Sequence, residues 1–240
     1  MTSGPEDTPE DTPEDNPEGA PEDPNEALAL RVDIVSDVVC PWCIIGYRQL
    51  ERALAAEGLT AEVHWHPFEL NPSMGPEGQE LKEHVAEKYG STPEESQSAR
   101  QRLSELGQSL DFPMDYFEGM RIWNTFAAHQ LLHWAGELGK GSELKRALFE
   151  SYFQRREKVD DRTVLIAAVE RAGLDGGEAA QVLEDERYAK AVRDVEQFWI
   201  ERGIQGVPAM VFQGRYLLSG AQGEERYAAF LQQLRDGVPA

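Results

Sequence analysis

Cysteine is scarce in this 240-residue chain: it occurs only at Cys40 and Cys43. No second cysteine pair exists, so neither a framework of structural disulfides nor a zinc site built from two such pairs is expected. The sequence also has no run of about 18 apolar residues, which argues against a membrane span. No basic stretch followed by an apolar stretch opens the chain, so we expect no secretory signal and a cytoplasmic location.

Basic residues are also in short supply: 23 Lys and Arg stand against 44 Asp and Glu, for a net charge of -21. This excess of negative charge disfavours nonspecific binding to nucleic acid. Either an ordinary solvated surface or an adaptation to high salt accounts for it. A composition of 40% hydrophobic and 9% aromatic residues can fill a core. The length fits one large domain, or one domain with an inserted subdomain.

The first 27 residues repeat Pro-Glu-Asp with Thr, Asn and Gly between, and up to residue 26 they contain no Lys or Arg. Such a segment buries too little apolar surface to offset the loss of chain entropy. We therefore predict a disordered, acidic, proline-rich tail over residues 1–27. The alternative is an acidic interaction arm.

Hydrophobic patterning predicts a strand, a helix and a strand, then a long helical block, then two strands and a helix. The ranges are 28–36, 41–57, 62–70, 79–203, 209–212, 215–219 and 222–234. Within the block we expect five to seven helices, among them 124–138, 142–155, 161–172 and 186–202, and no strand. A two-residue turn at Gln213-Gly214 should join the last two strands. The order predicts an α/β fold made of a βαβ unit (28–75), an all-helical insertion (76–203) and a ββα unit (204–237).

Both cysteines lie in one motif, Cys40-Pro41-Trp42-Cys43, where the first strand meets the first helix. Pro41 suits a first helical position, and a helix N-terminus stabilises negative charge. Such a setting lowers a cysteine pKa from about 8.5 to about 3.5–7.5, and the thiolate is the reactive species. We predict that Cys40 is the nucleophile and that Cys43, one turn on and better shielded, resolves the mixed disulfide. Pro41 and Trp42 should shape the rim.

A cysteine pair at a helix start, followed far downstream by Gly206-Val207-Pro208 before a strand, resembles the thioredoxin fold. The long helical insertion narrows the resemblance to the DsbA family. The stretches VHWHPFELNP (63–72), NTFAAH (124–129), GIQGVP (203–208) and SGAQ (219–222) resemble its cytoplasmic FrnE-like branch. That branch is related to 2-hydroxychromene-2-carboxylate isomerases and kappa-class glutathione transferases. The similarity covers roughly residues 30–234.

The resemblance implies further site residues. In that fold the proline corresponding to Pro208 is cis and faces the thiols, so Val207 and Pro208 would bind an extended substrate strand. Position alone would favour an ordinary trans proline at the start of an edge strand. Asn124 and His129 are candidates for lining the cleft above the thiols. Alternatively, Asn124 or Thr125 caps a helix and His129 hydrogen-bonds in a partly buried position.

Some residues depart from the family pattern. Secreted DsbA proteins usually carry a histidine where this chain has Trp42, so the direction of electron flow stays open. Some FrnE-like proteins have an extra cysteine pair, which is missing here. The related isomerases usually have serine at the position of Cys40, and a cysteine there favours redox chemistry. No metal site is predicted, although His64 and His66 share a face of one strand.

The prediction that follows is a thiol–disulfide oxidoreductase acting on disulfides in proteins or small thiols. It should require no cofactor, and glutathione is a candidate co-substrate. We expect no nucleic-acid or membrane partner, and a monomer or homodimer. Two alternatives stay open: a glutathione-dependent isomerase or transferase acting on a small aromatic substrate, and a peptide-binding chaperone.

Overall fold

The computed structural model describes Met1 and residues 30–237. The tail predicted for residues 1–27 therefore lies, apart from Met1, outside the described residues. A four-stranded sheet has the order β2-β1-β5-β6. Its strands are β1 (Leu30–Ser36), β2 (Ala61–Pro67), β5 (Ala209–Phe212) and β6 (Tyr216–Ser219). The β1–β2 pair is parallel and the other pairs are antiparallel, as the predicted βαβ and ββα units require.

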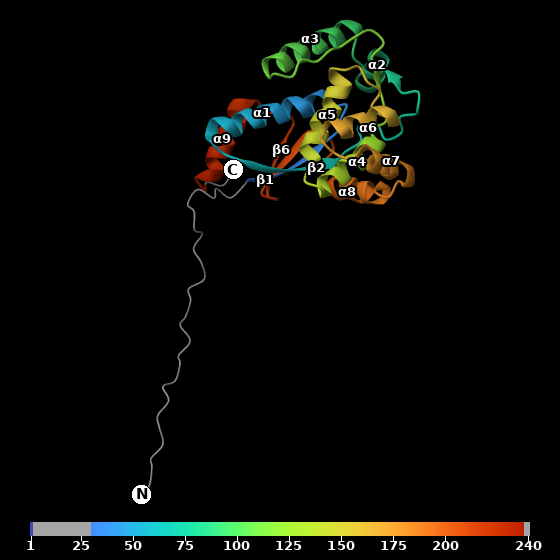
Figure 1. The fold of residues 1–240 in the computed structure, drawn as a ribbon. Helices are drawn as coiled ribbons and strands as arrows, with labels where there is room; N and C mark the ends of the chain where they lie inside the picture. Colours follow the sequence, from blue (N-terminus) through green and yellow to red (C-terminus); the bar gives the residue numbers. More distant parts are fainter. Residues whose placement is uncertain (2–29, 238–240) are drawn as a thin grey trace.

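One face of the sheet is covered by helices α1 (Pro41–Glu57) and α9 (Glu224–Arg235), which lie side by side (Figure 1). Phe230 of α9 packs edge-on against Phe212, with ring centroids 4.8 Å apart. In α1, a Cβ at Gly46 would lie 3.3 Å from Pro208 Cγ and from Met210 Cε. The lack of a side chain at Gly46 thus lets α1 approach the start of β5 closely.

The insertion between β2 and β5 is mostly helical, and α4, α5 and α8 pack against β2 (Figure 1). Its seven helices are α2 (Leu81–Tyr89), α3 (Pro93–Ser109), α4 (Phe126–Glu137), α5 (Gly141–Phe153), α6 (Arg162–Arg171), α7 (Gly176–Asp185) and α8 (Ala189–Glu201). Trp65 of β2 joins the layers, because its ring lies 4.8 Å from Tyr47 of α1 and 6.4 Å from Phe149 of α5. Across residues 30–237, no helix has both the length and the apolar character needed to cross a bilayer.

The expectation that residues 79–203 contain no strand is wrong. Strands β3 (Gln79–Glu80) and β4 (Arg121–Ile122) form a second, antiparallel sheet. Each has two residues, which is too short for an alternating pattern to show in the sequence. The pair ties the segment before α2 to the segment before α4.

Strand β2 ends at Pro67, three residues before the predicted end at residue 70. Beyond it, backbone donors find side-chain carboxylates instead of a neighbouring strand. Leu70 N donates to Asp37 Oδ2, and Glu69 N donates to a carboxylate oxygen of Glu196, both at 2.8 Å. The chain therefore leaves the sheet without leaving these N–H groups unpaired.

The β5–β6 hairpin has a three-residue loop rather than the predicted two-residue turn. Gln213 and Gly214 have positive φ values of 52° and 64°. Arg215, predicted as part of the strand, belongs to the loop, and its N–H donates to Phe212 O at 3.0 Å. The turn position was predicted and its length was not, since loops of both lengths use residues with positive φ.

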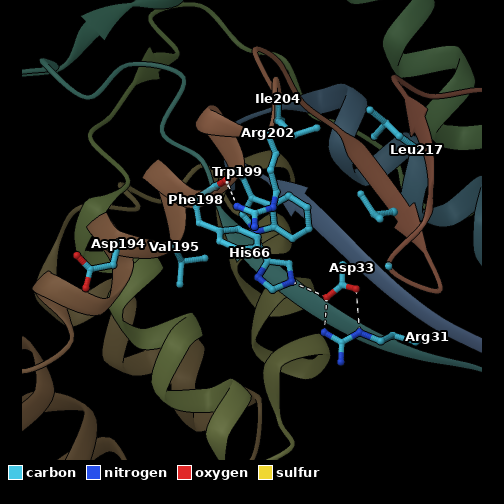
Figure 2. A pocket seen from close by; sticks show the side chains of 12 residues that line it. Arg31, Asp33, His66, Asp194, Val195, Phe198, Trp199, Arg202, Ile204 and Leu217 are labelled. Carbon is cyan, nitrogen blue, oxygen red and sulfur yellow. Dashed lines mark hydrogen bonds and ion pairs between the residues drawn. The ribbon is translucent and has the colours of Figure 1, made fainter.

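The opposite face of the sheet is partly open and forms a hollow of about 710 Å³ (Figure 2). Asp33 of β1 is buried there, and Figure 2 shows Arg31 and His66 converging on its carboxylate. The contacts are 2.8 Å from Arg31 Nη2 and 2.8 Å from His66 Nε2. Burial alone would raise the pKa of Asp33, but the hydrogen bonds from His66 and Arg31 outweigh burial and lower it.

We expect Asp33→Asn to destabilise the fold by about 1–3 kcal/mol at pH 7, because charge-assisted hydrogen bonds contribute about that much. The pKa of Asp33 is lower when folded, so its contribution is present above its unfolded pKa and disappears as pH falls through the folded value. The variant should therefore lose less stability than the parent between neutral and acid pH. Urea titrations over that range measure this. Asp194→Asn, at an exposed residue of the same hollow, is the control. An equal effect of the two substitutions would contradict the prediction.

Candidate active site

The cysteine motif occupies the turn between β1 and α1. Cys40 is the residue before the helix, Pro41 is its first residue, and Cys43 N donates to Cys40 O at 3.1 Å. Both sulfurs are free thiols. Cys40 is 4% exposed and Cys43 is fully buried, whereas the Trp42 side chain is 49% exposed. Cys40 is therefore the sulfur nearer to a substrate.

The Val207–Pro208 segment lies directly opposite Cys40. Its peptide bond is cis, and Cys40 Sγ donates to Val207 O over 3.7 Å. Pro208 precedes β5, the strand that pairs with β1. The sheet thus brings together the two predicted site elements, although 167 residues separate Cys40 from Val207.

A cavity of about 280 Å³ opens beside Cys40, and most of its wall is apolar. The motif contributes Cys40, Pro41 and Trp42, and the facing segment contributes Val207. The remaining wall comes largely from α2, α3 and the residues that precede α4. These include Leu81, Val85, Tyr89, Leu103, Tyr116 and Ile122. The insertion therefore forms one wall of the space in which a group bonded to Cys40 would lie.

The two thiols are coupled. Hydrogen bonding with Cys43, followed by burial, raises the pKa of Cys40 well above its ordinary value. Burial acts upward on Cys43 as well, but the Cys40 thiol hydrogen bond and the Lys145 charge lower its pKa. The sequence led us to expect the lowered pKa on Cys40. It falls on Cys43, because the hydrogen bond with Cys43, burial and the carboxylate of Asp37 all raise the pKa of Cys40.

Of the other predicted site residues, Asn124 and His129 do not line the cavity. Asn124 Oδ1 accepts the N–H of Phe126 at 2.9 Å just before α4, whose N-cap residue, Thr125, makes no side-chain capping bond. His129 is fully buried behind the cysteine turn, where its Nε2 lies 3.5 Å from Asp37 Oδ1. The structure thus places His129 beside Asp37 and outside the cavity wall.

Sequence reasoning missed two buried charged residues near the thiols, Asp37 and Lys145. Burial lowers the pKa of Lys145 to about 8, and the thiols and Asp37 act in the opposite direction. A signal for Lys145 exists in the sequence. It falls on the apolar stripe of its helix, three and four residues from Leu148 and Phe149, where a lysine is unusual.

The described residues hold no group of three or more His, Cys, Asp or Glu side chains placed to bind a metal ion. His64 and His66 each face a carboxylate instead. His64 Nε2 lies 2.9 Å from Glu62, and His66 Nε2 lies 2.8 Å from Asp33. The chemistry that this geometry supports is that of the two sulfurs.

Comparison with known proteins matches residues 31–232 to the family of DSBA-like thioredoxin domains. A probable DsbA oxidoreductase from Streptomyces coelicolor is 32% identical, with a TM-score of 0.80 over 88% of this chain and 92% of that one. The uncharacterized protein YwbO of Bacillus subtilis is 28% identical over 82% of this chain and 94% of its own length. The cytosolic disulfide reductase DsbM from Pseudomonas aeruginosa, solved with GSH, shares the fold at 20% identity. Its TM-score is 0.60, over 86% of this chain and 100% of that one.

Proposed function

The chain belongs to the family of DSBA-like thioredoxin domains, and from this premise we propose that it exchanges disulfides with protein or small-thiol substrates through Cys40 and Cys43. The membership confirms the DsbA-family resemblance and makes the chain a thiol–disulfide oxidoreductase. The proposed site rests on one observation: Cys40 Sγ contacts Val207 O, and both residues line the same apolar cavity, whereas Cys43 does not.

The exchange runs in two steps. Cys40, as a thiolate, attacks a substrate disulfide, forms a mixed disulfide and releases one substrate thiol. Cys43 then attacks Cys40, the bond to substrate breaks, and a Cys40–Cys43 disulfide remains. The reverse sequence passes that disulfide to a substrate dithiol. Although the lowered pKa lies on Cys43, Cys40 lines the cavity and Cys43 does not. Loss of the Cys40 proton, to Cys43 or to solvent, then produces the attacking thiolate.

No cofactor is needed for these steps, because both electrons reside on the two sulfurs. Glutathione is the co-substrate that we propose, in keeping with a cytoplasmic location. The glutathione-bound structure of DsbM, which shares this fold, supports that choice. An isomerase or transferase that binds glutathione is the second candidate. The apolar cavity beside Cys40 favours it, since such a space accepts an aromatic substrate.

Equilibration in glutathione buffers tests the proposal. As the glutathione potential is raised from roughly −320 to −180 mV, we expect a reversible transition in which the free thiols fall from two to none. The count is unambiguous because the chain has two cysteines. Cys43→Ser, which cannot close the internal disulfide, is the control. Thiols that stay free across the whole range in the parent protein would overturn the proposal.

A further inference from the structure

Charged and polar groups from several elements are buried near the thiols and do not line the cavity beside Cys40. Asp37 comes from the β1–α1 turn, His129 from α4 and Lys145 from α5, and all three are buried. In this region of the described chain, Ser36 Oγ and Glu69 Oε1 are buried without a hydrogen-bond partner, and Asp37 Oδ1 and His129 Nε2 face only each other, at 3.5 Å. Such atoms are costly in a protein interior, so this cluster needs an explanation.

Lys145 is the least expected member of the cluster. Its side chain is 1% exposed. Its ammonium donates one long hydrogen bond, to Ser36 O at 3.4 Å, and lies 5.2 Å and 5.1 Å from the ring centroids of Trp65 and Phe149. A well-packed apolar side chain would often stabilise such a site better than a buried charge. Packing alone therefore does not account for a lysine here.

The electrostatics of the thiol pair change during turnover. In the reduced protein the Cys40 thiol hydrogen bond and the positive charge of Lys145 both favour ionisation of Cys43. Once Cys40 is bonded to a substrate sulfur, it has no proton to donate. The hydrogen bond disappears at the step in which Cys43 must attack as a thiolate. Lys145 is then the cation that still acts on Cys43.

We propose that Lys145 is a positioning residue for the resolving step, supplying the positive charge that Cys43 needs in order to attack the mixed disulfide. Cys43 loses its proton to solvent, and its sulfur bonds to Cys40. The bond between Cys40 and the substrate sulfur breaks, and the electron pair leaves on that sulfur, which then takes up a proton. Lys145 transfers nothing and does not line the substrate cavity. The inference rests on the proposed disulfide exchange.

Several titratable groups act on the two sulfurs and on Lys145 from the elements packed around them. They are Asp37 of the turn, Tyr227 of α9, and Lys88, Tyr89 and Tyr116 near Cys40, while His129 of α4 acts on Asp37. The negative charge of Asp37 opposes ionisation of Cys40. Lys145 keeps its proton below about pH 8. Its effect on Cys43 is therefore present at neutral pH and is lost as pH rises through about 8.

One molar equivalent of 5,5′-dithiobis(2-nitrobenzoate) separates the two steps, because attack by Cys40 releases the first thionitrobenzoate and resolution by Cys43 releases the second. In Lys145→Met we expect the second release to slow more than the first, with its pH midpoint shifted upward. At pH 7 the second release should slow about three- to fourfold for each unit by which the pKa of Cys43 rises. The thiolate fraction falls tenfold, and the higher nucleophilicity of a more basic thiolate offsets part of that loss. The difference from the parent should shrink above about pH 8.

Lys140→Met is the matched control, since Lys140 is a partly exposed lysine just before the same helix and pairs with Glu143. A folded Lys145→Met protein with parental second-release rate and midpoint would overturn the inference. A pH midpoint for the second release at or above about 8.5 in the unmodified protein, the ordinary pKa of cysteine, would also overturn the inference, and that measurement needs no variant. A parent protein without any second release would overturn the proposed function itself, so the two failures are distinguishable.

Discussion

Cys43→Ser should accumulate one covalent adduct per chain with a substrate disulfide and should not turn over. Cys40 lines the cavity and keeps its contact with Val207 O, so the first attack is retained. A serine hydroxyl at position 43 is not acidic enough to replace the thiolate in the second attack. Intact-mass measurement after mixing with an oxidised peptide, or a non-reducing gel, shows the adduct.

The matched control is Cys40→Ser, which keeps the other sulfur. In the structure two effects compete. Charge favours Cys43 as the attacking group because its pKa is lowered, while access favours Cys40 because Cys43 is fully buried. Access to the substrate should determine which cysteine attacks first, because disulfide exchange requires the attacking sulfur to contact the substrate sulfur. Cys40→Ser should therefore form no adduct. Adducts on Cys40→Ser but not on Cys43→Ser would show that Cys43 attacks first.

The order of strands and helices could be predicted because each long element carries its own local signal. For α1 these signals are Pro41 at the first position and Gly58, with a φ of 65°, at the end. Elements that depend on distant partners carried none. The two-residue strands β3 and β4 exist because they pair with each other, and Leu70 N leaves the sheet because Asp37 accepts its hydrogen bond.

The site divides in the same way. The motif Cys40-Pro41-Trp42-Cys43 is contiguous, so its chemistry is visible in the sequence. The arrangement of charge around it is not, because Asp37, His129 and Lys145 come from three separate elements. Sequence reasoning placed His129 at the substrate and the anion on Cys40. The His129 candidate came from the family resemblance. The Cys40 expectation considered one helix N-terminus alone, whereas the pKa of Cys40 depends on Cys43, burial and Asp37, and the pKa of Cys43 depends on Cys40 and Lys145.

Packing of the insertion against β2 should also stabilise the fold around the active site, and Phe149→Ala tests this. Phe149 is fully buried, packs against Trp65 of β2 and lies beneath the ammonium of Lys145. Truncating a buried phenylalanine costs about 3–5 kcal/mol through lost transfer free energy and an unfilled cavity. That is a large share of a typical total of about 5–15 kcal/mol. Urea or thermal unfolding measures the loss.

Phe198→Ala serves as the control, because Phe198 is a phenylalanine of α8 that is 42% exposed, whereas Phe149 is fully buried. It should change the free energy of unfolding by about 0.5 kcal/mol or less, as surface substitutions usually do. In Phe149→Ala the new cavity adjoins Lys145, so the ammonium loses one of its two aromatic neighbours and gains freedom to move away from Cys43. Resolution of the mixed disulfide should then slow together with the loss of stability. A full loss of stability with an unchanged resolution rate would show that the rest of the cluster holds Lys145 in place without Phe149.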